Sequence, residues 1–263
     1  ILESMGVSFQ LQTEIGKDIE FQSLTQEYDA VFVGIGTYKA VTGELPGAAL
    51  AGVYSALPFL IQNTRHQLGL EEEGLAIKDK KVVVLGGGDT AQDCNRTAVR
   101  LAAKSVTCVY RRQEAAMPGS RREVQYAKEE GVSFNFHLQP VKICGDAHVT
   151  GVEFEDTRDG RLVHIEADIV VVAFGFRPDP PAWLQTNGIH ICKDGRIKVS
   201  EQKRLTGQTS NTKVFAGGDI VRGADLVVTA VFEGREAAMS ILQALKVGEA
   251  YRPLQIAVLD ESA

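Results

Sequence analysis

The chain has few cysteines, and no two of them are spaced as a pair. Its 263 residues include only four, with no CxxC motif. The sequence therefore shows neither a dithiol redox centre nor a zinc or iron–sulfur ligand set. We expect Cys94, Cys108, Cys144 and Cys192 to be buried thiols in a reducing compartment, which favours the cytoplasm.

Long apolar runs, excess positive charge and clustered histidines are also missing. The longest apolar run, residues 169–176, is strand-sized, whereas a bilayer span needs about eighteen residues. We therefore expect a soluble protein without a membrane partner. The formal net charge of −6 argues against a nucleic-acid partner. The five histidines show no catalytic-triad or metal spacing, so no catalytic side chain or metal ligand is predicted.

Glycine is plentiful, and its most informative cluster follows an apolar strand at 81–85. In the GxGxxA pattern that follows, Gly86 permits a tight turn and Gly88 lets the backbone approach a pyrophosphate. Ala91 allows the next helix to pack closely on the strand. The candidate phosphate-binding residues are Gly86, Gly87, Gly88, Asp89, Thr90 and Ala91. The alternative is a glycine turn that serves packing alone.

Two arginines directly follow the next expected strand, which spans 105–110. A protein that binds the unphosphorylated dinucleotide usually offers an acidic residue to the ribose there, whereas this chain has Arg111 and Arg112. Guanidinium groups make forked, charged hydrogen bonds to phosphate. The pair therefore predicts NADP(H) rather than NAD(H), and the alternative is a solvated strand end.

A possible capping box follows at Ser120 and Glu123, where the S-x-x-E pattern opens an expected helix at 120–130. Arg121 and Arg122 lie between them. These two arginines either complete a phosphate pocket with Arg111 and Arg112 or serve as ordinary surface charge.

The pattern of elements predicts three parts, with boundaries at residues 77 and 172. The acidic link 71–74 indicates the first boundary. In the second part, strands at 81–85, 105–110, 132–138 and 168–174 alternate with helices, and a β-meander spans 141–166. This order predicts a parallel sheet flanked by helices with an antiparallel insert. Expected outside that part are strands at 7–13 and 30–33, a turn at 193–195 within the segment 189–199, and helices at 55–67 and 226–245.

A second chemical signal lies in the third part. Gly218 and Asp219 follow a short apolar strand, and the long helix begins soon after them. The Asp219 carboxylate could accept hydroxyl groups of a ribityl chain, and a helix N-terminus favours the negative charge of a reduced flavin. The helix-start residues are Leu226, Val227, Val228 and Thr229. A plain turn capped by Asp219 is the alternative.

Together these segments resemble the small subunit of NADPH-dependent glutamate synthase and its AegA-type paralogues, over essentially the whole chain. The segments that carry the resemblance are 34–39, 53–60, 85–93, 110–112, 117–120, 173–176 (with Gly175) and 215–229.

The resemblance implies an α/β fold with two dinucleotide-binding, Rossmann-like domains, as in FAD- and NAD(P)-linked reductases. Residues 1–77 and 173–263 would be pieces of an FAD domain, and 78–172 would be the NADPH domain. In such enzymes a hydride passes from NADPH to FAD, and electrons leave through iron–sulfur centres to a large subunit or an iron–sulfur domain.

The chain departs from the family pattern before Ile1. The first FAD fingerprint and the cluster-binding cysteines are not in this sequence. We therefore expect a C-terminal fragment with a truncated FAD domain, weak or no FAD retention and no turnover by itself. The alternatives are a related electron-transfer flavoprotein with another acceptor, and a nucleotide-binding module without turnover.

Overall fold

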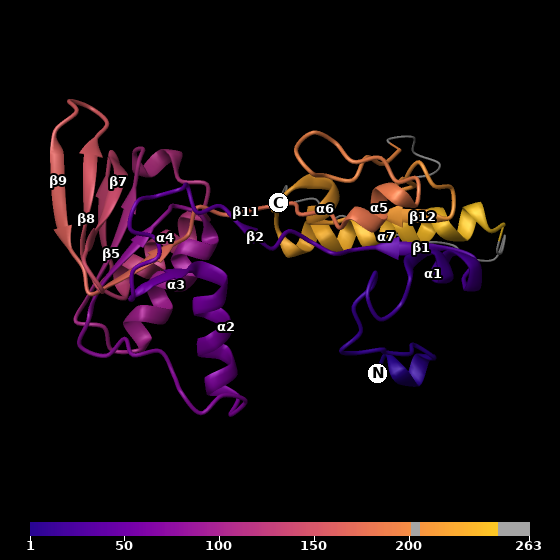
Figure 1. The fold of residues 1–263 in the computed structure, drawn as a ribbon, viewed down its shortest axis with the longest axis horizontal. Coiled ribbons are helices and arrows are strands. Elements are labelled where there is room, and N and C mark those ends of the chain that lie inside the picture. The colour runs from indigo at the N-terminus through magenta and orange to yellow at the C-terminus, as the bar shows by residue number, and fades with distance from the viewer. Residues whose placement is uncertain (201–205, 247–263) are drawn as a thin grey trace, which may run out of the picture. The chain divides into compact units, whose positions relative to one another are not determined.

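The computed structural model describes residues 1–200 and 206–246, and the chain divides into two compact units. Unit 1 contains residues 1–38 and the described residues from 177 onward, and unit 2 contains residues 39–176. The chain passes between the units twice, at β2 (Lys39–Ala40) and β11 (Phe176–Arg177). These two short strands pair with each other (Figure 1).

Unit 2 is built on a five-stranded parallel sheet, as the alternating pattern predicts. The strand order is β3 (Val53–Ser55), β10 (Ile169–Val172), β4 (Lys81–Leu85), β5 (Ser105–Tyr110) and β6 (Ser133–Phe136). Its helices are α2 (Ala56–Gln67), α3 (Asp89–Arg100), α4 (Arg121–Glu129) and the short 3-10 helix η2 (Glu114–Ala116).

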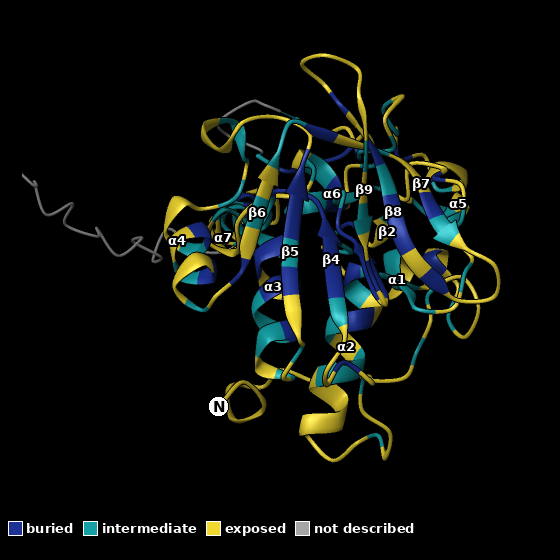
Figure 2. Ribbon diagram, turned by 90° about the vertical axis from the view of Figure 1, so that its left-hand side faces the viewer, coloured by how far each residue is buried: buried dark blue, intermediate teal, exposed yellow. Residues whose placement is uncertain are grey.

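An antiparallel sheet of β7 (Leu138–Gly145), β8 (Val149–Asp156) and β9 (Leu162–Glu166) forms the expected insert. Successive side chains of β4 point to opposite faces of the parallel sheet. Val82 and Val84 pack with residues of α2 and α3, whereas Val83 and Leu85 pack with residues of the antiparallel sheet. Both faces are covered, so β4 is apolar along nearly its whole length and buried (Figure 2).

Unit 1 has a two-stranded parallel sheet of β1 (Val31–Val33) and β12 (Val214–Ala216). Its helices are α1 (Phe21–Glu27), α5 (Ala182–Thr186), α6 (Asp219–Arg222), α7 (Val227–Ala244) and the 3-10 helix η1 (Glu3–Met5). A small apolar core joins β1, β12, α1, α5 and α6, with Phe21, Val33, Leu184 and Ile220 nearly fully buried.

The boundaries between the two units differ from the part boundaries that the sequence pattern predicts. The units meet at 38/39 and 176/177 rather than near 77 and 172, because β3 pairs with β10 and so brings the preceding residues into unit 2. The acidic link 71–74 is a loop inside that unit. The strand expected at 7–13 does not form. The turn expected at 193–195 is confirmed, and an isolated antiparallel bridge between Ile191 and Ile197 flanks it.

Only two of the four cysteines are buried, whereas burial of all four was expected. Cys94 and Cys108 are buried, whereas Cys144 and Cys192 are partly exposed, and all four are free thiols. Burial raises the pKa of the Cys94 thiol to about 12 and that of Cys108 to about 11, so both stay protonated at neutral pH.

Neither a bilayer-spanning helix nor a metal-binding cluster is found within residues 1–200 and 206–246. Each helix there is too short or too polar to cross a bilayer. No three histidine, cysteine or acidic side chains of this part of the chain gather as a metal site would require.

Candidate functional site

The glycine turn joins β4 to α3, and each of its three glycines meets a different constraint. Gly86 has φ +144°, and a Cβ there would lie 2.2 Å from the Ala173 carbonyl oxygen. A Cβ on Gly87 would lie 2.6 Å from the Tyr110 ring. Gly88 is open, since its nearest neighbour would be Pro118 at 4.0 Å. Gly86 and Gly87 are therefore required by packing, and only Gly88 leaves room for a ligand.

The turn also presents hydrogen-bond donors. Gly88 is the N-cap of α3, and its carbonyl accepts the N–H groups of Ala91 and Gln92. Among the described residues, no acceptor serves the N–H groups of Gly88, Asp89 and Thr90. Unpaired N–H groups at the start of a twelve-residue helix suit an anion such as a pyrophosphate.

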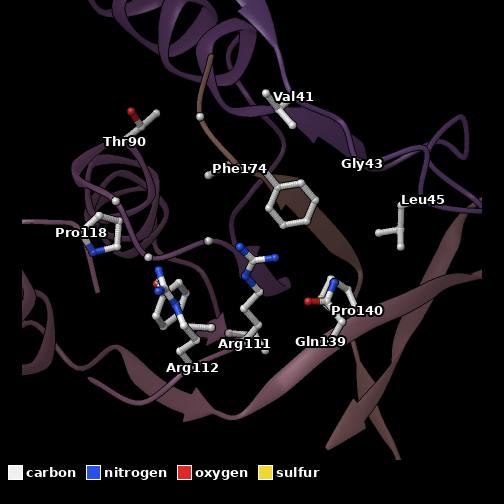
Figure 3. Close-up of a pocket in the computed structure, with 17 residues that line it drawn as sticks. Val41, Gly43, Leu45, Thr90, Arg111, Arg112, Pro118, Gln139, Pro140 and Phe174 are labelled. Atoms are coloured by element: carbon white, nitrogen blue, oxygen red, sulfur yellow. Dashed lines mark hydrogen bonds between the residues drawn. The ribbon is translucent and has the colours of Figure 1, made fainter. Parts of the chain in front are cut away.

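A cavity of about 440 Å³ opens beside this turn, entirely within unit 2 (Figure 3). Its lining includes the three glycines, Thr90, both arginines that follow β5, and Gly175. Further lining residues, which no sequence motif indicates, are Val41, Leu45, Gln139 and Pro140. They come from a loop and from β7 and carry no motif, so only the folded chain identifies them.

Arg111 and Arg112 both line this cavity, but they differ in their hydrogen bonds. The Arg112 guanidinium donates to the Tyr110 hydroxyl from Nε at 3.1 Å and from a terminal nitrogen at 2.7 Å. Within the part of the chain that the structure describes, the Arg111 guanidinium has no ion pair and no hydrogen bond. In Figure 3 its side chain points toward Phe174, and that of Arg112 points toward Pro118. The cavity thus holds a permanent positive charge that no described side chain neutralises.

The segment 118–120 lies directly on the glycine turn. The N–H of Gly119 donates to the Gly87 carbonyl at 3.1 Å, and the N–H of Ser120 donates to the Asp89 carboxylate at 2.7 Å. A Cβ on Gly119 would lie 3.0–3.1 Å from backbone atoms of residues 87–89. Asp89 therefore ties this segment to the start of α3.

The predicted capping box is wrong. Ser120 does occupy the N-cap of α4, but its side chain makes no capping hydrogen bond. The Glu123 carboxylate instead pairs with Arg96 of α3, which also pairs with Glu130 at 2.9 Å. A charged guanidinium is a stronger partner for a carboxylate than a backbone N–H, so the contact between helices prevails.

Arg121 and Arg122 lie outside the lining of the cavity. Arg121 is the exposed first residue of α4. The Arg122 guanidinium donates to the Tyr126 hydroxyl at 2.6 Å, on the same helix. The structure therefore does not bring these side chains to Arg111 and Arg112.

The second predicted site lies in unit 1. Asp219 is the first residue of α6, and its carboxylate accepts the Thr37 hydroxyl at 3.4 Å. Gly218, with φ +74°, donates its N–H to Glu233 at 2.6 Å.

The start of α7 is open to solvent. Leu226, Val227 and Val228 are 57–76% exposed, and Thr229 lies within the first turn. An apolar surface beside the N-terminus of an eighteen-residue helix is compatible with the ring of a flavin. The Asp219 carboxylate could accept hydrogen bonds from the hydroxyl groups of the ribityl chain, so these residues fit a flavin.

The chain is similar to several glutamate synthase small chains and related oxidoreductases. It is 50% identical to the "Glutamate synthase [NADPH] small chain" of Halomonas elongata, over 94% of this chain and 56% of the relative. It is 48% identical to the Escherichia coli small chain and to the "Putative oxidoreductase AegA" of the same organism, covering 57% and 41% of them. The expected resemblance is confirmed, and the chain spans about half the length of these relatives.

Solved structures confirm the expected fold class. FprA of Mycobacterium tuberculosis in complex with NADPH matches 89% of this chain and 67% of its own, with a TM-score of 0.70 at 16% identity. Thioredoxin reductase of T. acidophilum matches 83% of this chain and 66% of its own, with a TM-score of 0.66 at 24% identity. Residues 3–234 match the model of the pyridine nucleotide-disulphide oxidoreductases, and the chain belongs to this family.

Proposed function

We propose that unit 2 binds NADPH and that the chain forms part of an NADPH-dependent flavin oxidoreductase. The observation that carries the proposal is the Arg111 guanidinium, which has no partner among the described residues, in the cavity beside the N–H groups that begin α3. The α3 N-terminus would hold the pyrophosphate, and Arg111 and Arg112 would hold the 2′-phosphate. Asp89 would act indirectly, by fixing segment 118–120.

The chemistry requires no acid, base or nucleophile from this chain. FAD, when bound, accepts a hydride from NADPH and releases electrons one at a time. The residues of unit 2 bind and orient the dinucleotide. In unit 1, Asp219 and the start of α7 would hold the flavin.

The relatives support a proposal for the onward path of the electrons. Because similar chains are glutamate synthase small chains, we propose iron–sulfur centres as acceptors and a large subunit or iron–sulfur domain as partner. Four free cysteines support a reducing compartment, the cytoplasm.

Adding excess FAD and then NADPH to the purified protein without oxygen tests this function. We expect the flavin absorbance band to bleach, because hydride transfer reduces the flavin. A protein that binds NADPH but no flavin would instead be a nucleotide-binding module. Flavin that stays oxidised in the presence of bound NADPH would contradict the proposed reaction.

Replacing Asp219 by alanine tests the second site. If the carboxylate holds the ribityl chain, Asp219→Ala should weaken flavin binding by about tenfold, through loss of a charged hydrogen bond. The measurement is the dissociation constant of added FAD, from the change in its fluorescence on titration with protein, with circular dichroism to check folding. Asp194→Ala is the control, because Asp194 pairs with Arg196 at a surface turn of the same unit. Equal FAD affinity of wild type and Asp219→Ala would count against this role.

A further inference from the structure

Tyr110, the last residue of β5, touches three parts of the candidate site. Its ring lies against Gly87, where it fills the space that a Cβ would occupy. Its hydroxyl donates to the Ala116 carbonyl of η2 at 2.8 Å. The Arg112 guanidinium stacks over the same ring at 5.6 Å and donates twice to the hydroxyl. The side chain is only 7% exposed, so its position is fixed by packing.

The hydrogen bonds of the hydroxyl are complete in this arrangement. A tyrosine hydroxyl has one hydrogen to donate and two lone pairs that can accept. The hydrogen goes to Ala116, and two N–H groups of Arg112 occupy the acceptor positions. The contact with η2 therefore orients the lone pairs toward Arg112.

This arrangement leaves Arg112 able to bind a ligand. A guanidinium has five N–H groups, and Tyr110 engages two of them, which leaves three. A free arginine loses much side-chain entropy when it binds a phosphate. An arginine already held on a tyrosine ring has lost part of that entropy beforehand, so binding costs less.

We propose that Tyr110 is a positioning residue for dinucleotide selectivity, which holds the Arg112 guanidinium ready for the 2′-phosphate of NADPH. This inference rests on the proposed function of unit 2. It assigns different tasks to the two arginines: Arg112 is pre-ordered by Tyr110, and Arg111 is free to close on the ligand.

Tyr110→Phe tests the proposal, because it keeps the ring against Gly87 and removes only the hydroxyl. The measurement is calorimetric titration of the full chain with NADPH and with NADH. We expect NADPH to bind about tenfold more weakly and NADH to change by less than about twofold, since only NADPH carries the 2′-phosphate. The matched control is Tyr126→Phe, whose hydroxyl holds Arg122 outside the cavity. It should leave both affinities unchanged.

A double-mutant cycle shows whether Tyr110 acts through Arg112. In the Arg112→Ala background, Tyr110→Phe should cause no further loss of NADPH affinity. Equal losses for NADPH and NADH would overturn the proposal, because the hydroxyl would then support only the fold of the turn. A full NADPH preference in Tyr110→Phe would also overturn it. If wild type shows no preference for NADPH, the proposed function itself fails, and the inference fails with it.

Discussion

Arg111→Ala combined with Arg112→Ala is expected to weaken NADPH binding by about 100-fold and NADH binding by less than about threefold. Each guanidinium can make charged hydrogen bonds to the 2′-phosphate, and NADH has no such group. Both side chains line the cavity, and Arg111 is exposed, so the fold should tolerate the change. The measurement is the dissociation constant of each dinucleotide by titration calorimetry.

The control for this pair must remove the same charge from elsewhere in unit 2. Arg100→Ala with Arg161→Ala does so, because both side chains are exposed and pair with Glu130 and Asp159. The chain already carries a net charge of −6, so a general electrostatic effect would weaken NADPH in both double variants. Equal losses of NADPH and NADH in the Arg111/Arg112 variant would refute recognition of the 2′-phosphate.

Gly86→Ala and Gly88→Ala should separate the folding role of the turn from its binding role. At Gly86 the added Cβ would meet the Ala173 carbonyl oxygen at 2.2 Å, and φ is +144°. The N–H of Ala173 donates to Leu85 at 2.8 Å, which prevents an easy shift. We expect Gly86→Ala to lower the free energy of unfolding by about 3 kcal/mol.

Gly88→Ala should leave the stability of the fold nearly unchanged and weaken dinucleotide binding. Its φ of −87° suits alanine and its surroundings are open, so the free energy of unfolding should change by less than about 1 kcal/mol. The new methyl group would occupy space that the pyrophosphate needs, and NADPH and NADH should both bind at least about tenfold more weakly. Urea unfolding and calorimetric titration measure the two effects. Undiminished binding by Gly88→Ala would mean that the dinucleotide lies elsewhere.

Much of unit 2 could be predicted because its signals are local. The run Val82–Leu85 is apolar at every position since helices cover one face of the sheet and the antiparallel sheet covers the other. The glycine pattern and the alternation of strands and helices then indicate a parallel sheet. The parallel sheet of unit 2 and the segment of the glycine turn follow from these features alone, whereas the two-domain fold class came from the resemblance.

Other features depend on contacts between distant segments. The three residues of β3 join the sheet through β10, far along the chain, which moves the boundary of the unit to residue 38. Glu123 does not cap its helix as expected, because its carboxylate forms an ion pair with Arg96 of another helix. The sequence singles out Arg112 but cannot show that Tyr110 already holds it, since that contact depends on the turn after β5.

The ratio of NADPH to NADH affinity of the unaltered chain tests whether unit 2 recognises the 2′-phosphate. Calorimetric titration of the 263-residue protein gives both constants without any flavin or electron acceptor. If the cavity of unit 2 recognises the 2′-phosphate, NADPH should bind at least about tenfold more tightly than NADH. Equal affinity, or tighter binding of NADH, would contradict the account.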